Sequence, residues 1–218
     1  MAHVKPMQRE DIPALEGVMA SSEAMMGFVP NSMLTMAHMP QMAMAFSMFA
    51  GTVFGADLQQ IVANYQDQIP EDPAAGEALS PDIVQLTAYC VSLSAGCRYC
   101  QAHTSHNAHK FGIDKEKLLD VLNYETSALF SHAEKAVIGI ALAAGQVPND
   151  TNDEQFEALR AHFTQRQVVQ LVGVISLFGF LNRWNDTMAT QLEAIPTSFA
   201  QDTLDQAGWE VAKHAEET

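Results

Sequence analysis

The chain has 218 residues, of which 48% are hydrophobic, and its 11 Lys and Arg face 26 Asp and Glu for a formal net charge of -15. This composition is typical of a globular protein with a sizeable core and excludes a disordered chain. A phosphate-binding surface needs clustered cations, so we expect neither a nucleic-acid partner nor binding to an anionic membrane. The longest apolar run, residues 168–181, is too short for a membrane-spanning helix, which needs ~20 apolar residues.

Helix signals recur along the whole chain and strand signals are almost absent, which predicts an all-α fold. The spacing of apolar residues predicts helices at residues 9–23, 39–51, 54–68, 81–95, 97–111, 114–123, 131–145, 152–162 and 165–190, with a last helix near 199–214. Three segments match the capping box, in which a hydroxyl residue is followed three residues later by Glu or Gln: Ser131–Glu134, Thr151–Glu154 and Thr164–Gln167.

A linker rich in Pro and Gly is predicted at residues 69–80. We therefore expect an N-terminal helical extension (1–69), a main helical domain (70–190) and a C-terminal tail with a short helix (191–218). The polar start of the chain lacks the apolar segment of a secretory signal, so we expect a cytoplasmic protein. In such a reducing compartment a close cysteine pair is more often catalytic or metal-binding than structural.

The segment CRYCQAHTSHNAH places Cys97, Cys100, His103, His106 and His109 at every third position. On a helix, a step of three residues turns the side chain about 60° backwards, so the first three share an arc of about 120°. The last two point elsewhere and are interpreted as surface or packing residues. A structural zinc site needs a second pair of ligands, and the chain offers no second CxxC, so we predict no metal.

A redox function fits the first three residues better. The pair Ala95-Gly96 should end the preceding helix, so that Cys97 begins a new one, whose N-terminus lowers the pKa of a thiol. Arg98 adds a nearby cation. Cys97 and Cys100 are spaced to form a disulfide, and His103, one turn further on, is placed to exchange a proton. The alternative is a pair of buried apolar cysteines beside an unrelated histidine.

The stretch Gly96-Cys-Arg-Tyr-Cys-Gln-Ala-His103-Thr resembles the signature of the carboxymuconolactone decarboxylase / AhpD-like alkylhydroperoxidase superfamily. The resemblance covers roughly residues 80–187. It implies an AhpD-like helical domain, assembly as a homo-oligomer, and reduction of hydroperoxides by a thiol peroxidase without a bound cofactor. It also implies an external dithiol reductant of the lipoyl or thioredoxin type, with Cys100 attacking the peroxide and Cys97 resolving the intermediate.

Two positions depart from the family pattern. Gln85 stands twelve residues before Cys97, where the family has a glutamate for its proton relay. The histidine follows Cys100 by three residues, and Thr104 fills the usual slot. Gln85, Tyr99 and Thr104 are therefore the candidate relay groups, with Asp82 as a substitute acid. Two other functions stay open: a cofactor-free decarboxylase-like enzyme and a non-enzymatic redox-sensing protein.

Three further features are interpreted as mainly structural. Cys90 lies in an apolar context and is expected to be a buried free thiol. Methionines at helical spacing usually fill a core or line a pocket, and this interpretation is favoured over a copper(I) site for Met33, Met36, Met39 and Met42. Arg183 and Asp186 are spaced to pair on one helix face, and the cluster 182–186 is assigned to structure ahead of an active-site mouth or subunit contact.

Overall fold

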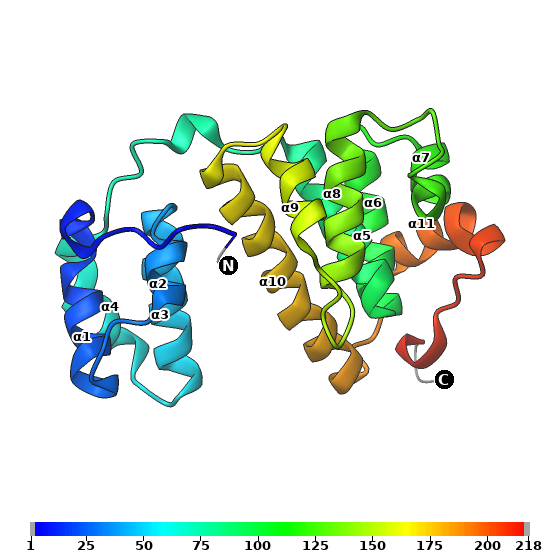
Figure 1. The fold of residues 1–218 in the computed structure, drawn as a ribbon. Coiled ribbons are helices and arrows are strands. Elements are labelled where there is room, and N and C mark those ends of the chain that lie inside the picture. The colour runs from blue at the N-terminus through cyan, green and yellow to red at the C-terminus, as the bar shows by residue number, and fades with distance from the viewer. Residues whose placement is uncertain (1–2, 216–218) are drawn as a thin grey trace. The chain divides into compact units, whose positions relative to one another are not determined.

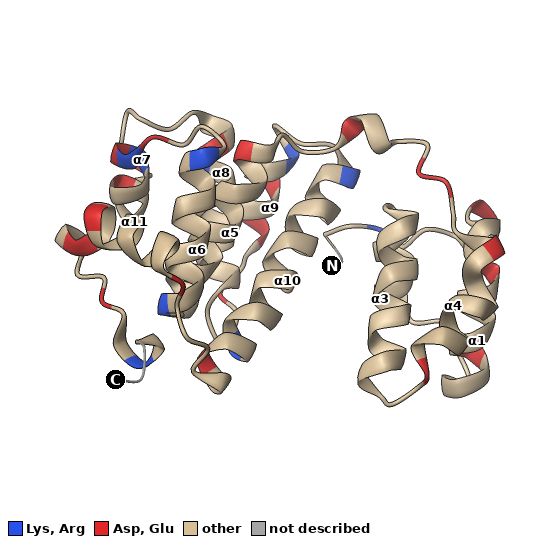
Figure 2. Ribbon diagram, turned by 180° about the vertical axis from the view of Figure 1, so that it is seen from behind, with Lys and Arg blue, Asp and Glu red and all other residues tan. Residues whose placement is uncertain are grey.

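A computed structural model describes residues 3–215. Within these residues the chain forms eleven α-helices and short 3-10 turns but no β-strand, which confirms the all-α prediction. No helix in the described part of the chain combines the length and apolar character needed to cross a bilayer. Lys and Arg are scattered among more numerous Asp and Glu (Figure 2).

The chain divides into two compact units. The first comprises Met1–Ala78 with Gln165–Gln170, and the second comprises Leu79–Thr164 with Leu171–Thr218. The first unit contains α1 (Glu16–Met26), α2 (Asn31–Met36), α3 (Pro40–Val53) and α4 (Leu58–Tyr65). Its buried core consists of Ile12, Leu15, Val18, Met19, Met33, Ala37, Ala43 and Met44. Met33 is buried in this core and Met36 packs against it, which supports the packing interpretation of the methionines.

The helix predicted at residues 9–23 is wrong in its first half. Pro13 has no N–H to donate, and the segment instead forms two 3-10 turns, Arg9–Asp11 and Pro13–Leu15. Helix α1 then begins at Glu16 and ends at Met26, and the following Gly27 has a φ of 81°, a left-handed conformation that favours glycine. The short helix α2 was not predicted.

The second unit carries the cysteines. It contains α5 (Pro81–Ala95), α6 (Arg98–Lys110), α7 (Lys115–Asp120), α8 (His132–Ala144), α9 (Asp153–Arg160), most of α10 (Gln165–Met188) and α11 (Ala194–Leu204). Helix α5 packs against both α6 and α8, α9 packs against α8, and α11 packs against α6 (Figure 1). The cysteine pair follows the C-terminal end of α5. Because α5 packs against α6 on one side and α8 on the other, the position of this helix end is well defined.

Two helix ends agree with the sequence and two do not. The Ser131–Glu134 capping box is present at α8. At α9 the box is Asn152–Gln155 and not Thr151–Glu154, since the Asn152 side chain accepts the Gln155 N–H at 3.0 Å. Helix α5 begins at Pro81 as expected. The last helix spans Ala194–Leu204, so the prediction of 199–214 is wrong in its second half.

Candidate functional site

The two cysteines of the CxxC motif lie at the junction of α5 and α6. Helix α5 ends at Ala95, Gly96 adopts a left-handed φ of 75°, and Cys97 is the N-cap of α6. The Cys97 Sγ accepts a hydrogen bond from the Cys100 backbone N–H at 3.4 Å. Both side chains are buried, 1% and 3% exposed, and both are free thiols. The predicted helix start at Cys97 is therefore confirmed.

The two thiols differ strongly in acidity. The pKa of Cys97 is lowered to about 7, first because the Cys100 thiol donates a hydrogen bond to it and then because backbone N–H groups of Cys100 and Tyr99 do so, while burial and Asp186 act in the opposite direction. The pKa of Cys100 is raised, because its proton is held by Cys97 and because it is buried. Asn185 Nδ2 donates to the Cys100 Sγ at 3.6 Å, which lowers the pKa of Cys100 but does not outweigh the causes that raise it. These electrostatics favour Cys97 as the thiolate, the opposite of the order that the family resemblance implies.

The His103 ring is engaged by a carboxylate. Its Nε2 lies 2.7 Å from Glu193 Oε2, and Tyr99 donates its hydroxyl proton to the other carboxylate oxygen at 3.0 Å. Burial and the Glu193 carboxylate raise the pKa of Tyr99 to about 12. Burial acts to raise the pKa of the Glu193 carboxyl. The hydrogen bonds from its backbone amide, His103 and Tyr99 outweigh burial, so the pKa is lowered. Within residues 3–215 no hydrogen bond joins His103 to a cysteine, so its role in proton transfer stays a prediction.

The other predicted relay groups, Gln85 and Thr104, make no side-chain hydrogen bond to either sulfur among the described residues. The buried Thr104 hydroxyl donates to the Cys100 carbonyl at 2.6 Å. Gln85 is half-buried in the first half of α5.

Cys90 is a buried free thiol as expected, and burial raises its pKa. His106 and His109 pack around the Phe199 ring, at centroid distances of 5.3 and 5.4 Å.

Two residues that the sequence did not assign to the site lie beside Cys97. The Cys97 Sγ, an Asp186 carboxylate oxygen and a His214 ring nitrogen all lie within 4.8 Å of one another. His214 is 1% exposed, and its Nδ1 lies 2.8 Å from the Thr190 carbonyl oxygen. Asp186 pairs with Lys213 at 2.9 Å, so the predicted pairing with Arg183 is replaced by one to the C-terminal segment.

Cys97, Asp186 and His214 offer ligand types that zinc accepts. Tetrahedral zinc, with bonds of about 2.0–2.3 Å, draws its ligand atoms to roughly 3.5 Å of one another. The separations here reach up to 4.8 Å, and Asp186 is engaged by Lys213. The arrangement therefore suits proton exchange among the three groups better than coordination of an ion.

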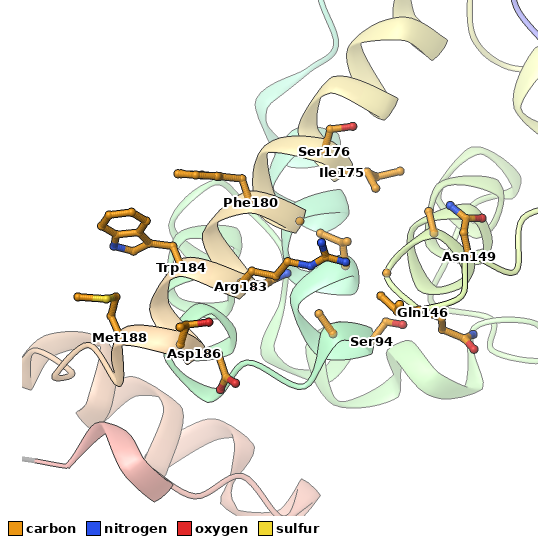
Figure 3. A pocket seen from close by; sticks show the side chains of 18 residues that line it. Ser94, Gln146, Asn149, Ile175, Ser176, Phe180, Arg183, Trp184, Asp186 and Met188 are labelled. Atoms are coloured by element: carbon orange, nitrogen blue, oxygen red, sulfur yellow. The ribbon is translucent and has the colours of Figure 1, made fainter. Parts of the chain in front are cut away.

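An open cleft of about 1120 Å³ adjoins this cluster. Its lining residues include Asp186, so the cleft and the cysteine site share one side chain. Arg183 extends from α10 toward the loop that carries Gln146 and Asn149 (Figure 3). Phe180 and Trp184 project from another side of the same helix. Residues of the 182–186 cluster therefore line an open cleft beside Cys97, and its role as an active-site mouth stays a prediction.

One polar side chain in the cleft wall has no partner in the protein. Asn182 is 4% exposed and lines the cleft, and neither end of its amide makes a hydrogen bond within the described residues. A buried amide without a partner is costly, and in a cleft wall it is suited to bind a polar group of a ligand.

Comparison with known proteins agrees with this architecture. Residues 56–143 match the model of the carboxymuconolactone decarboxylase family, and the crystal structure of the debrominase Bmp8 aligns with 93% of this chain and 96% of its own, at 30% identity and a TM-score of 0.53. The chain belongs to the carboxymuconolactone decarboxylase family.

Two further similarities place this family member among its relatives. The crystal structure of a cysteine-to-alanine variant of Bmp8 in complex with 2,3,4-tribromopyrrole also aligns with this chain. The alignment covers 94% of this chain and 97% of the Bmp8 chain, at 29% identity and a TM-score of 0.52. Uncharacterized protein YnjA of Escherichia coli (strain K12) is 29% identical over 119 residues, which are 55% of this chain. The match spans 61% of the length of YnjA.

Proposed function

We propose that this protein is a thiol-dependent reductase in which Cys97 and Cys100 become a disulfide while a small substrate is reduced. The observation that carries this proposal is the asymmetric thiol pair: Cys97 is the N-cap of α6, and its Sγ accepts the Cys100 N–H at 3.4 Å. With the Cys100 thiol, these donors lower the pKa of Cys97 to about 7, whereas the pKa of Cys100 is raised. A thiolate that is populated at neutral pH is the form that attacks, and a neighbouring thiol resolves the product. The proposal gives Cys97 the attacking role.

With a hydroperoxide, the Cys97 thiolate attacks the terminal oxygen. A sulfur–oxygen bond forms, the oxygen–oxygen bond breaks, and the alkoxide leaves and takes up a proton. The product is a sulfenic acid on Cys97. Cys100 then attacks this sulfur, so that water leaves and the disulfide forms. An external dithiol, of the lipoyl or thioredoxin type, returns both cysteines to thiols and is itself oxidised.

A halogenated aromatic is the second candidate substrate. It is favoured by the similarity to the debrominase Bmp8 along most of the chain and by the open cleft with apolar walls beside Asp186. Here the Cys97 thiolate attacks the bromine, a sulfur–bromine bond forms, and the electron pair of the carbon–bromine bond stays on carbon, which takes up a proton. Cys100 then displaces bromide and forms the same disulfide, so both substrates use the same reductant.

The test is turnover by the reduced, full-length chain with dihydrolipoamide as reductant. Cumene hydroperoxide consumption and bromide release from 2,3,4-tribromopyrrole are followed in parallel. Cys97→Ser should abolish turnover, and Cys100→Ser should stop after a single event. With peroxide, that event leaves a sulfenic acid on Cys97 that dimedone labels. Cys90→Ser removes a buried thiol outside the pair and is the matched control, expected to behave as wild type.

Turnover also separates this proposal from its alternatives. A redox-sensing protein would oxidise once without sustained consumption of dithiol. A decarboxylase-like enzyme would act without either cysteine. Retention of activity in Cys97→Ser, or absence of turnover with both substrates, would overturn the proposed reductase.

The proposal includes assembly as a homo-oligomer. Helix α10 exposes several large apolar side chains of the second unit, and exposed apolar patches often mark association surfaces; they are Leu177, Phe180, Trp184 and Met188. Light scattering should give a multiple of the 23.8 kDa chain mass at micromolar concentration. A mass equal to that of one chain would contradict the expectation.

A further inference from the structure

We propose that His214, carried by the C-terminal segment Trp209–His214, is the proton acceptor for the Cys97 thiol. The inference rests on the proposed chemistry at Cys97. It assigns to His214, near the C-terminus, the proton exchange that the sequence predicts for His103, one turn after the cysteine pair.

The hydrogen bonding of His214 determines which ring nitrogen can accept a proton. The Thr190 carbonyl oxygen, 2.8 Å from Nδ1, can only accept a hydrogen bond. In the neutral ring Nδ1 therefore carries the proton and Nε2 carries the lone pair. Nε2 is buried and makes no hydrogen bond within the part of the chain that the structure describes. A ring nitrogen of this side chain lies within 4.8 Å of the Cys97 Sγ, a separation that one water molecule or a small thiol rotation bridges.

The C-terminal segment is tied to the cysteine site at several points. Trp209 Nε1 donates to the Arg98 carbonyl in the first turn of α6 at 3.2 Å. The Leu192 N–H donates to the His214 carbonyl at 2.9 Å. Lys213 pairs with Asp186 near the end of α10. These contacts fix the imidazole against the thiol, as a base must be fixed to act on a nucleophile.

The backbone of this segment is also strained. Ala212, two residues before His214, has a φ of 50°, a left-handed conformation that residues with a Cβ rarely adopt. Strain of this kind persists only where the surrounding contacts hold it, and it is concentrated at functional sites. The conformation of Ala212 thus agrees with a C-terminal segment that is held in place to position the imidazole.

Proton transfer to His214 fits the charges that face it. When the proton leaves the Cys97 Sγ, the His214 Nε2 takes it up. The resulting imidazolium is favoured by an Asp186 carboxylate oxygen, which lies 3.9 Å from this nitrogen. Lys213 on the same segment partly neutralises Asp186, and the Tyr99 ring lies 5.8 Å away. When the substrate bond breaks, the imidazolium returns this proton to the leaving alkoxide or to the aromatic carbon, so the proton balance closes.

The test is the pH dependence of Cys97 alkylation by iodoacetamide, read peptide by peptide with mass spectrometry. In His214→Gln the side chain remains polar but cannot take up a proton, so the midpoint of the alkylation profile should move upward by about 1 pH unit or more, the effect expected when a cation within about 4–6 Å of a thiolate is lost. Cumene hydroperoxide turnover should fall by about 10²-fold, the usual size of a general-base effect. His162→Gln, at an exposed histidine beyond the end of α9, is the matched control and should leave both unchanged.

A rescue experiment separates proton transfer from packing. In His214→Gly, millimolar imidazole should restore part of the alkylation rate at pH 7, which a purely structural role would not allow. Three results would overturn the inference: His103→Gln moves the midpoint while His214→Gln does not; imidazole fails to rescue a folded His214→Gly; or the wild type carries one zinc per chain that His214→Gln loses. If wild type reduces neither substrate while alkylation still depends on His214, the proposed function fails and the inference stands.

Discussion

Replacing the Cys100 thiol tests how much of the acidity of Cys97 comes from its neighbour. The hydrogen bond from the Cys100 side chain is the largest cause of the low pKa of Cys97. Cys100→Ala removes this donor and keeps the backbone N–H that also donates to the Cys97 Sγ. The pKa of Cys97 should therefore rise from about 7 toward the ordinary 9.0. Cys100→Ser keeps a donor at the same place and should retain most of the depression.

The expected change in rate follows from two opposing effects. At pH 7, a thiol with a pKa of about 7 is about half ionised, whereas one with a pKa of about 9 is about 1% ionised. Complete loss of the shift thus reduces the thiolate population about 50-fold. The more basic thiolate is the better nucleophile, and a Brønsted coefficient of about 0.4–0.5 recovers about 6- to 10-fold. The alkylation rate of Cys97 at pH 7 should therefore fall about 5- to 8-fold in Cys100→Ala.

The assay is alkylation by excess iodoacetamide between pH 5 and 10, with Cys97 followed as its own peptide. Cys90 is fully buried with a raised pKa and serves as an internal reference that should stay unlabelled while the protein is folded. A Cys100→Ala profile that superimposes on the wild type would refute the reasoning. In that case the acidity of Cys97 would arise from the backbone amides and the other groups around it.

Three other substitutions test the fold and the cleft. Ser131→Ala should lower the free energy of unfolding by about 1 kcal/mol, because it removes the reciprocal cap with Glu134; a urea titration with an unchanged midpoint would count against the cap. Ala189→Gly should raise the thermal midpoint, since the φ of 49° at the end of α10 costs a residue with a Cβ about 1 kcal/mol; a lowered midpoint would contradict this. Asn182→Leu should keep or increase the free energy of unfolding, because its amide has no partner, while raising the KM of a substrate bound in the cleft; a clear loss of stability with an unchanged KM would argue for a purely structural amide.

Local chemistry explains which parts of the fold were predictable. Gly96 and the Ser131 capping box set helix ends through contacts within a few residues, and both predictions hold. The last helix begins earlier than the predicted residue 199, at Ala194. Pro196 is the third residue of α11, within the first turn, where a backbone N–H has no partner in the helix. Gly208, with a φ of 76°, then separates that helix from the C-terminal segment.

The CxxC pair was predictable as a redox site because the spacing and the helix start follow from adjacent residues. The ranking of the two thiols was not predictable in the same way. It depends first on the direction of one hydrogen bond between the sulfurs. Two residues of α10 also act on the pair: Asn185 lowers the pKa of Cys100 and so opposes the ranking, and Asp186 raises the pKa of both thiols. Family resemblance supplies a ranking without these local contacts, whereas the contacts favour Cys97 as the thiolate.

His103 and His214 show why proximity in sequence is a poor guide to a proton acceptor. A histidine one turn beyond Cys100 is placed on a similar face of the helix, but helix geometry does not determine which groups face it. His103 is 33% exposed and its ring is engaged by Glu193. His214 is buried, its Nε2 makes no hydrogen bond within the described residues, and one of its ring nitrogens lies within 4.8 Å of the Cys97 Sγ. No spacing rule links positions 97 and 214, because their contact depends on tertiary bonds such as the one from Trp209 to α6. Trp209→Phe keeps an aromatic ring but removes this donor, so it should loosen the segment and raise the midpoint of Cys97 alkylation, as His214→Gln does. If it leaves the alkylation profile unchanged, the other ties of the segment are sufficient to hold the imidazole in place.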